Sequence, residues 1–321
     1  MGSNAPGDPL RDPPIWALAV HGGAGAGREE EHAAEKADAI RATLKSVLEA
    51  AGALLASGGS ALDAVEAAVC ALEDSPLFNA GRGSVFNERG EHELEASIMD
   101  GRTLAAGAAA VLRGIRNPVS LARLIMERSP HVFLQGDGAL LFASAHGIAR
   151  VDPGYFRTER RWKTLEDAKR DASAHAGAGP IGARSQDLGT VGAAALDMQG
   201  NLAAATSTGG LTNKAVGRVG DSPIIGAGTF ASNESCAVSC TGHGEYFIRA
   251  TAARDIAALI EYGGKDLQTA VDIVIGQRLS RLGGEGGAIA VDRAGRVAFA
   301  FNTDVMIRGC VTSTAPPYAE I

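Results

Sequence analysis

The sequence predicts an α/β (α+β) fold in which layers of helix pack on two central β-sheets. The 321 residues are 45% hydrophobic and only 21% charged, which is enough apolar material for a substantial core. Predicted helices occur in pairs and predicted strands in runs, so the β-α-β alternation of a doubly wound parallel sheet is missing.

The first half of the chain begins with a short apolar stretch, residues 15–20, that predicts a buried strand. Apolar residues at helical spacing from Ile40 to Leu55 predict a long helix, which Gly58 and Gly59 end. Ser60 opens a capping-box pattern and a second helix to about Glu73. The later elements expected here are a glycine-rich loop over residues 75–90, a strand over 105–112, and helices starting near Asn117 and Gly138.

The second half starts with a segment that shows no periodicity. It runs from about residue 152 and predicts a flexible linker over 155–188, which ends directly at Gly189. A linker there would expose the following peptide bond. The elements expected after it are strands over residues 190–196, 202–206 and 237–241, helices over 245–261 and 266–282, and a closing hairpin of 288–292 and 297–301.

Charge and composition exclude several classes of partner. The net charge is −7, and the most basic stretch, residues 157–170, is interleaved with acidic residues, so we expect no nucleic-acid partner. No apolar stretch is long enough to span a bilayer, and residues 1–14 lack the apolar core of a secretory signal. The four cysteines have no zinc-ligand spacing. We therefore expect a cytoplasmic protein without a membrane partner.

The step from Gly189 to Thr190 carries the most chemical information. A threonine hydroxyl is a weak nucleophile near pH 7 and needs a base, and a free α-amine with a pKa of about 8 is a suitable one. Cleavage of the Gly189–Thr190 bond would give Thr190 both groups. A Gly-Thr-Val-Gly sequence by itself is more often a turn that enters a buried strand.

Seven short motifs reverse that preference. They occur in the order found in the plant-type L-asparaginase and isoaspartyl-peptidase family, which the chain resembles. The motifs are HGGAG (residues 21–25), FNAGRG (78–83), ASIMDG (96–101), GTVGA (189–193), TSTGG (206–210), GRVGDSP (217–223) and TGHGE (241–245). Each is weak alone, but seven in order are specific.

The resemblance implies a four-layer αββα sandwich of the N-terminal nucleophile (Ntn) hydrolase type, with mostly antiparallel central sheets. It implies one domain over residues 1–321, self-cleaved into an α subunit, 1–189, and a β subunit, 190–321. Relatives pair two cleaved αβ units, so a homodimer of these units (a heterotetramer of subunits) is expected.

The resemblance also assigns catalytic roles. Thr190 would be the nucleophile of self-cleavage and of hydrolysis, and the Thr208 hydroxyl would tune it. The Thr241 hydroxyl and the Gly242 N–H would stabilise the oxyanion that develops during acyl transfer. Asn79 would lie near the Thr190 amine. Without the other motifs, these positions would be a strand-end hydroxyl and ordinary glycine turns.

A substrate with free α-amine and α-carboxylate groups needs one fixed cation and one fixed anion. By resemblance, Arg218 grips the carboxylate, and Asp221 and the Gly244 carbonyl hold the ammonium. The alternative for the first two is a surface salt bridge between them, of little functional meaning. His243 has no family role and is expected to pack or to face solvent.

The family also carries a structural sodium ion bound by main-chain carbonyls, and no cofactor is implied for catalysis. Carbonyl oxygens suit a hard cation whatever the side chain, so the sequence alone leaves this site open. The side chain of Arg82 would have to point away from the ion. The matching positions are Leu72, Glu73, Ser75, Phe78, Ala80 and Arg82.

The predicted function is hydrolysis of β-aspartyl (isoaspartyl) dipeptides and L-asparagine, with release of L-aspartate. A glycosylasparaginase-like amidase is disfavoured by GTVG and TGG around Thr190 and Thr208, and a threonine aspartase by the acidic Asp221. An unprocessed, catalytically silent amino-acid-binding protein of the same fold stays open. Residues 22–27 follow a strand but lack the spacing of a nucleotide-phosphate loop.

Overall fold

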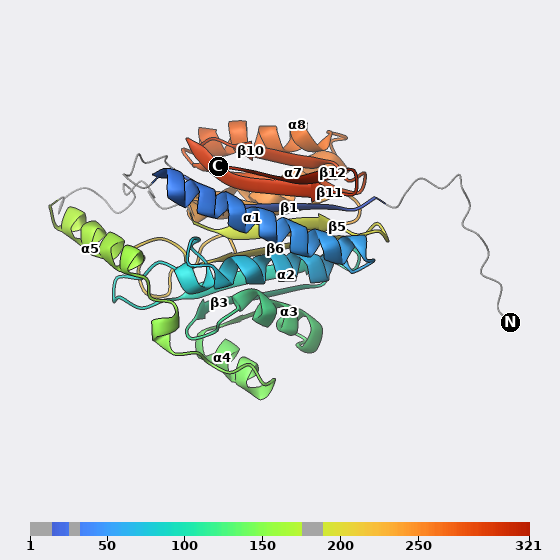
Figure 1. The fold of residues 1–321 in the computed structure, drawn as a ribbon. Coiled ribbons are helices and arrows are strands. Elements are labelled where there is room, and N and C mark those ends of the chain that lie inside the picture. Colours follow the sequence, from blue (N-terminus) through green and yellow to red (C-terminus); the bar gives the residue numbers. More distant parts are fainter. Residues whose placement is uncertain (1–14, 26–32, 175–188) are drawn as a thin grey trace, which may run out of the picture.

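Two β-sheets form the middle of the molecule (Figure 1). The computed structural model describes residues 15–25, 33–174 and 189–321. The larger sheet contains, from edge to edge, β12 (Ala315–Glu320), β11 (Val305–Thr312), β1 (Ala17–Gly25), β5 (Val191–Leu196), β6 (Leu202–Thr208), β2 (Leu94–Asp100), β3 (Ala106–Leu112) and β4 (Phe133–Gln135). The smaller sheet contains β10 (Val297–Phe301), β9 (Gly286–Asp292), β8 (Cys236–Gly242) and β7 (Thr229–Ala231).

Strand direction agrees with the prediction of mostly antiparallel sheets. Within the described residues, every pair of neighbouring strands is antiparallel except β3 with β4. The central strands are buried on both faces, so β5 and β6 consist almost entirely of apolar or small residues. On β5, Ala193 and Ala195 face the outer helices, whereas Ala194 and Leu196 face the second sheet.

Helices cover the outer face of each sheet and complete four layers (Figure 1). The larger sheet is covered by α1 (Ala33–Ala56), α2 (Ala61–Asp74) and α3 (Pro118–Arg128), and α4 (Gly136–Ala145) packs near its β3–β4 edge. The smaller sheet is covered by α6 (Gly244–Ala250), α7 (Ala252–Glu261), α8 (Leu267–Asp272) and a π-helical segment, η3 (Ile273–Leu279). The predicted αββα sandwich is therefore confirmed.

Helix α2 shows how the local sequence determines its ends. The Ser60 side chain accepts a hydrogen bond from the Asp63 N–H, as the capping pattern predicts. Leu72, Val65 and Val69 lie on one side of the helix and are fully buried against β5 and β6. This packing holds the following loop, which begins at Ser75, beside the ends of the central strands.

The linker predicted over residues 155–188 is wrong in its first part. A short 3-10 turn, η2 (Pro153–Tyr155), leads into helix α5 (Glu159–Ala174), and residues 175–188 lie outside the described part of the chain. Helix α5 is strongly polar, so its sequence lacks an apolar stripe. It is attached instead by Arg161, which is buried and donates from Nε to the Gly83 carbonyl over 2.8 Å, and by Trp162, which packs edge-on to Phe86.

The C-terminal elements also differ from the prediction. The hairpin of β9 and β10 is confirmed, but it does not close the chain, because β11 and β12 follow it. Strand β12 contains Pro316 and Pro317, and prolines are atypical of strands, so the sequence did not predict it. Both prolines are tolerated because β12 is an edge strand. Strand β2 was not predicted as a strand, and its residues 96–100 were identified only as part of the motif ASIMDG. The helix predicted over 245–261 is broken at Thr251, which has a φ of 46°.

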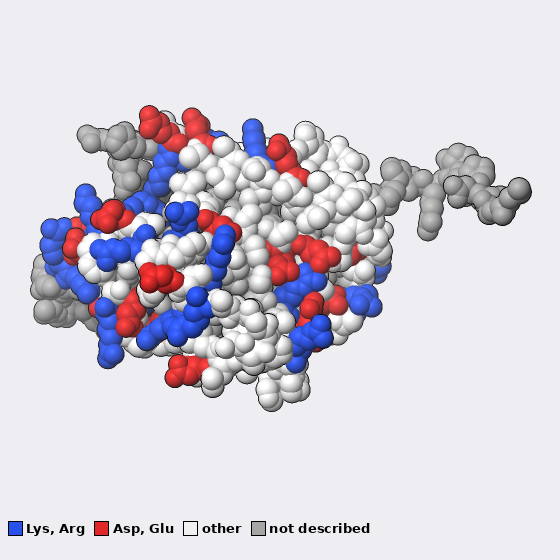
Figure 2. All heavy atoms as spheres, turned by 60° about the horizontal axis from the view of Figure 1, so that its bottom comes forward, with Lys and Arg blue, Asp and Glu red and all other residues white. Residues whose placement is uncertain are grey.

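One face of the molecule carries charges of both signs (Figure 2). On the face shown in Figure 2, Lys and Arg side chains are interspersed with Asp and Glu rather than gathered in one basic patch. Among the described helices, none is both long and apolar enough to cross a membrane.

Candidate active site

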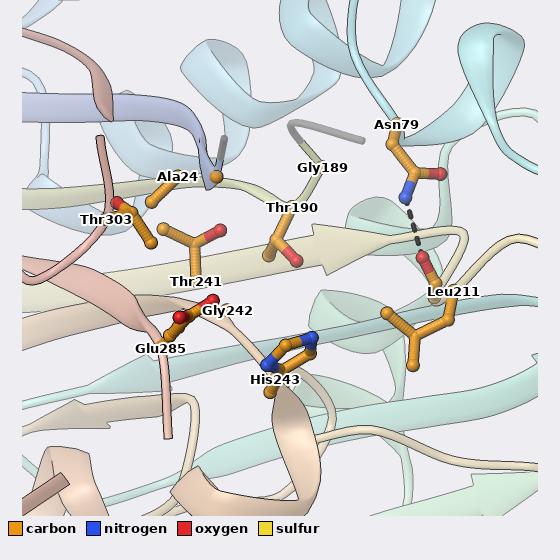
Figure 3. A pocket seen from close by; sticks show the side chains of 12 residues that line it. Ala24, Asn79, Gly189, Thr190, Leu211, Thr241, Gly242, His243, Glu285 and Thr303 are labelled. Carbon is orange, nitrogen blue, oxygen red and sulfur yellow. Dashed lines mark hydrogen bonds between the residues drawn. The ribbon is translucent and has the colours of Figure 1, made fainter. Parts of the chain in front are cut away.

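Thr190 directly precedes β5 and lies beside the end of β6. The two strands are antiparallel, and Val191 pairs with Ser207, which places Thr190 next to Thr208. The Thr190 hydroxyl donates to the Thr208 hydroxyl over 3.2 Å. Thr190 is 7% exposed, at the floor of a cavity, and Figure 3 shows its side chain pointing into that space. Thr208 is thus the last residue of β6, as expected, and its hydroxyl contacts the Thr190 hydroxyl.

The peptide bond before Thr190 is held by the loop after α2. The Gly189 carbonyl oxygen accepts the Asn79 backbone N–H over 3.1 Å. The Asn79 side chain is engaged elsewhere: Nδ2 donates to the Gly210 carbonyl over 2.7 Å (Figure 3), and Oδ1 accepts the Val85 N–H over 2.9 Å. Asn79 therefore contacts the Gly189–Thr190 peptide through its backbone, whereas the sequence had suggested only a polar neighbour.

Thr241 and Gly242 end strand β8 and face the same cavity as Thr190 (Figure 3). Gly242 has a φ of +150°, and a Cβ there would lie 2.4 Å from the Glu285 carbonyl oxygen, so only glycine fits. The smaller sheet thus brings Thr241 and Gly242 to the cavity that Thr190 lines. The sequence analysis assigned no role at the site to several residues that line the cavity: Ala24, Gly25, Leu211, His243, Glu285 and Thr303.

His243 and Glu285 line this cavity for a reason that the sequence could not show. The His243 N–H donates to the Glu285 carbonyl over 3.0 Å, which ties the turn after β8 to the turn before β9. His243 is half-buried: its ring centre lies 6.2 Å from that of Tyr246, and the residue lines the cavity (Figure 3). A glycine-flanked histidine after a strand is a weak signal, and nothing in the sequence linked it to Glu285.

Asp221 and Arg218 line a second, adjoining pocket that also contains Thr190, Thr208 and Gly242. Asp221 is buried, and its Oδ2 has no hydrogen-bond partner within the described residues. Burial raises the pKa of Asp221 to about 7. Burial of a carboxylate oxygen without a hydrogen-bond partner costs free energy, and a bound cation would offset that cost, so this pocket is suited to a cation.

Gly244 and Arg218 shape the same pocket. A Cβ at Gly244 would lie 2.8 Å from the Asp221 N atom and 2.9 Å from its Oδ1, so the glycine allows helix α6 to approach the carboxylate. Arg218 forms a bidentate ion pair with Glu245, from Nε and Nη2 at 2.9 Å each. The alternative of an Arg218–Asp221 salt bridge is not seen in the described part of the chain, since Glu245 takes that place.

Two buried carboxylates anchor the loop that carries Arg218. Glu95 pairs with Lys214 over 3.1 Å, and both side chains are almost fully buried. The other Glu95 oxygen accepts the Gly220 N–H over 2.9 Å, and Glu93 accepts the Gly217 N–H over 3.0 Å. The sequence analysis did not identify these residues, although two glutamates at alternate positions of an apolar strand were a usable signal.

In the loop expected to bind sodium, two glycines lie close against main-chain carbonyls. A Cβ at Gly81 would lie 2.3 Å from the Glu73 carbonyl oxygen, and one at Gly83 would lie 2.0 Å from the Phe78 oxygen. Both glycines are therefore needed for this close approach. The Arg82 side chain is exposed, with its guanidinium 5.9 Å from the centre of the Tyr155 ring.

This loop can offer a metal ion the oxygen atoms of its main-chain carbonyls. The Leu72 carbonyl accepts the Ser75 N–H over 3.3 Å, and the Ala80 carbonyl accepts the Gly83 N–H over 3.2 Å; each carbonyl oxygen has a second lone pair. No cluster of His, Cys, Asp and Glu suited to a transition metal occurs in the described ranges. The loop is compatible with a hard cation.

Two stacked, mostly antiparallel sheets, with a threonine directly before a central strand and facing a cavity, define an Ntn-type hydrolase architecture. The chain matches the family model described as Asparaginase over residues 14–319, and it belongs to that family.

Curated relatives agree with this assignment. The chain is 52% identical to the isoaspartyl peptidase of Escherichia coli (strain K12) over 294 residues, 91% of each chain. It is 45% identical to the probable isoaspartyl peptidase/L-asparaginase 2 of Arabidopsis thaliana over 316 residues, covering 92% of this chain and 96% of that protein. It is 50% identical to the isoaspartyl peptidase/L-asparaginase of Homo sapiens over 246 residues, covering 75% and 77%. The family predicted from the seven motifs is confirmed.

Proposed function

We propose that the chain is a self-activating threonine amidohydrolase that releases L-aspartate from β-aspartyl dipeptides and L-asparagine. The observation that carries this proposal is the placement of Thr190. Its hydroxyl contacts Thr208, and it lines both the cavity with Thr241 and Gly242 and the pocket with Arg218 and Asp221. The names of the relatives support the same substrates.

Self-cleavage uses the peptide bond that Asn79 holds. The Thr190 Oγ attacks the Gly189 carbonyl carbon, and the Asn79 N–H at 3.1 Å stabilises the negative charge that develops on the Gly189 oxygen. The hydroxyl proton passes to the departing Thr190 nitrogen, and the C–N bond breaks to leave an ester on Oγ. Water then hydrolyses this ester, which frees the Gly189 carboxylate and the Thr190 hydroxyl and α-amine.

Substrate hydrolysis repeats the attack with a free amine as base. The Thr190 amine accepts the hydroxyl proton, and Oγ attacks the β-carbonyl carbon of the substrate. The Thr241 hydroxyl and the Gly242 N–H stabilise the oxyanion, and the proton moves to the leaving amine or ammonia. Water hydrolyses the aspartyl ester and releases L-aspartate.

The second pocket fixes the α-groups of the substrate. The buried, unpaired Oδ2 of Asp221 accepts the α-ammonium, together with the carbonyl of Gly244, and Arg218 attracts the α-carboxylate. Glu245 holds the Arg218 guanidinium by two hydrogen bonds, which reduces the conformational freedom lost on binding. None of these groups binds the leaving group of the amide, so the leaving group can be an amino acid, as in a dipeptide, or ammonia, as in asparagine.

A structural sodium ion, a homodimer of cleaved αβ units and a cytoplasmic location complete the proposal. The carbonyl oxygens of the six residues named for the sodium loop would hold the ion, and Gly81 and Gly83 allow the close packing of this loop against the Glu73 and Phe78 carbonyls. Such an ion would fix the loop that presents Asn79. All four cysteines are free thiols, which supports a reducing compartment.

The proposal is tested by incubating purified protein with β-aspartyl-leucine or L-asparagine and measuring released L-aspartate. We expect release from both, and loss of both activities in Thr190→Ala. Release from a glycosylated asparagine alone would favour the glycosylasparaginase alternative. Binding of L-aspartate without any release would favour a catalytically silent binding protein.

A further inference from the structure

The layer between the two sheets changes from apolar to polar at the end that holds Thr190. Ala19, Met99, Ala204, Ala231 and Ala237 belong to the apolar inter-sheet core. On each of the same strands, the residue two positions nearer the active site shares that face, because side chains alternate along a strand. These residues are all polar and fully buried: His21, Ser97, Thr206, Thr229 and Ser239.

His21 connects this polar cluster to the nucleophile. Its Nδ1 lies 3.0 Å from the Thr190 carbonyl oxygen, and its Nε2 lies 2.8 Å from the Ser239 Oγ. Burial lowers the pKa of His21 to about 3, so the ring is neutral and carries one N–H. A carbonyl oxygen can only accept, so the proton is on Nδ1, and the Ser239 hydroxyl donates to Nε2.

The hydroxyl chain continues across both sheets. Because Ser239 donates to His21, its oxygen accepts the proton of Thr206, 2.6 Å away. Thr229 donates to Thr206 over 2.6 Å. The Ser97 hydroxyl lies 2.8 Å from the Thr229 hydroxyl and 2.6 Å from the Ser222 carbonyl oxygen. The chain therefore runs from the carbonyl of the nucleophile to the residue that follows the buried aspartate of the second pocket.

Gly192 provides the space for this arrangement. A Cβ at Gly192 would lie 2.0 Å from the Ser239 Oγ and 2.5 Å from the His21 Nε2. Gly192 is not among the described glycines with positive φ, so its backbone conformation does not require glycine. The glycine of the GTVGA motif is thus explained by the histidine–serine contact rather than by a turn.

The Thr190 carbonyl needs this contact because the regular ladder ends before it. Strand β5 pairs with β1 from Leu196 to Gly192, and the last pair joins Gly192 to His21. Thr190 lies two residues beyond that pair. The His21 ring therefore extends the attachment of β5 to β1 by a side-chain hydrogen bond, at the residue whose orientation matters most.

We propose that His21 is a positioning residue, which fixes the carbonyl of Thr190 and thereby the direction of its Oγ, and that Ser239 and Thr206 fix the His21 tautomer. This inference rests on the proposed function. Misplacing a reacting atom by about 1 Å costs roughly 100-fold in rate. The role requires neither proton transfer by His21 nor contact with substrate.

The first experiment compares His21→Leu with His21→Asn, two side chains of similar size. The Asn amide can still donate to the Thr190 carbonyl, whereas Leu cannot. We expect His21→Leu to lower the rate of self-cleavage and the kcat of matured enzyme by roughly 10–100-fold, with little change in KM, and His21→Asn to recover most of the loss. Equal losses in the two variants would overturn the positioning role.

A second variant acts at a distance and does not depend on His21 replacements folding. Thr206→Val keeps the shape but removes the proton that Ser239 accepts; we expect a loss of about 3–10-fold in both rates, restored in Thr206→Ser. The ratio of wild-type to variant rates should stay constant between pH 5 and 9, because neutral His21 does not titrate there. A ratio that changes across that range would make His21 a proton-transfer group and overturn the inference.

The control is Asp197→Asn, at the far end of β5. Asp197 accepts the N–H groups of Gln199 and Asn201 in the β5–β6 turn, so its loss disturbs the same strand pair without touching the chain of hydroxyls. We expect a lower melting temperature and unchanged kcat. A matching kcat loss in this control would mean that general destabilisation explains the His21 effect. Wild-type protein that releases no L-aspartate would instead refute the proposed function itself.

Discussion

The nucleophile region and the second pocket use opposite kinds of interaction. Around Thr190 the contacts are hydrogen bonds between neutral groups: Thr208 and His21 on strands, and the Asn79 N–H on the loop after α2, which bonds to Gly189. In the second pocket the groups are charged and lie on a loop and a helix start: Arg218, paired with Glu245, and Asp221. In the proposed mechanism, the nucleophile region acts before any substrate is present, during self-cleavage, whereas the charged pocket acts only when a zwitterion binds.

This difference separates two measurable functions. Neutral contacts on paired strands hold the reacting atoms in one position, and their loss should affect self-cleavage and turnover together. The charged groups line a pocket in which one Asp221 oxygen, Oδ2, has no hydrogen-bond partner among the described residues, and their loss should affect substrate binding while self-cleavage continues. Variants that separate the two rates therefore test the division directly.

The largest effect is expected for Thr190→Ala. Removal of the hydroxyl should abolish self-cleavage and lower turnover by roughly 10⁵–10⁶-fold, as expected when a nucleophile is lost. Thr190→Ser is the matched variant, because it keeps the hydroxyl and should still cleave. Electrophoresis and L-aspartate release measure both outcomes, and a cleaved, active Thr190→Ala protein would remove Thr190 from the mechanism.

Asp221→Asn should separate the two regions most clearly. We expect kcat/KM for L-asparagine to fall by roughly 10²–10³-fold, because the ammonium loses its anionic partner, while self-cleavage proceeds at the wild-type rate. Steady-state kinetics on the matured variant and a time course of chain cleavage test this. If both rates fell in parallel, the two regions would not be independent.

Thr208→Val should lower both rates by roughly 10–100-fold, because the variant keeps the shape but loses the hydroxyl 3.2 Å from the Thr190 hydroxyl. Thr208→Ser should restore most of each rate. The same assays apply. A loss confined to self-cleavage would limit Thr208 to the maturation step.

Glu245→Ala should have a smaller effect, since the carboxylate acts through Arg218. We expect KM for L-asparagine to rise by about 3–10-fold with little change in kcat, and Glu245→Gln to show a smaller rise, because its amide oxygen still accepts one hydrogen bond. Initial-rate measurements over a range of substrate concentrations check this. A fall in kcat without a change in KM would contradict a binding role.

Stability should depend on pH through Asp221. Its pKa is raised to about 7 by burial, so the folded protein binds a proton that the unfolded chain releases near pH 4. The carboxylate therefore destabilises the fold increasingly as pH rises from about 4 to 7, and fully above 7. Asp221→Asn should raise the melting temperature by a few degrees (about 2–4 °C per kcal/mol) at pH 8 and by less at pH 5. An equal gain at both pH values would contradict the shifted pKa.

Much of the fold follows from residue patterns, and the exceptions have physical causes. Helix α2 has a cap and an apolar side that the sequence displays, and the β9–β10 hairpin has a glycine turn. Helix α5 was missed because its attachment depends on Arg161 and Trp162 rather than on an apolar stripe. Strand β12 was missed because two prolines are acceptable only at a sheet edge, and edge position is a property of the whole sheet.

The candidate site shows the same limit. The ordered motifs assigned Thr190, Thr208 and Asp221 to one site. Spacing along the chain could not show that Glu245 pairs with Arg218 or that His21 contacts the Thr190 carbonyl. Those contacts join strands from distant parts of the sequence, and they depend on how the two sheets stack. His21 was visible only as part of a glycine-rich motif.

The most direct test of the central claim is the intact mass of freshly purified protein under denaturing conditions, measured again after prolonged incubation. The account predicts two fragments, the second beginning with Thr190, whose proportion grows with time at the expense of the uncut chain. A single uncut chain at every time point, in protein that nevertheless hydrolyses L-asparagine, would contradict a mechanism that depends on a free threonine amine.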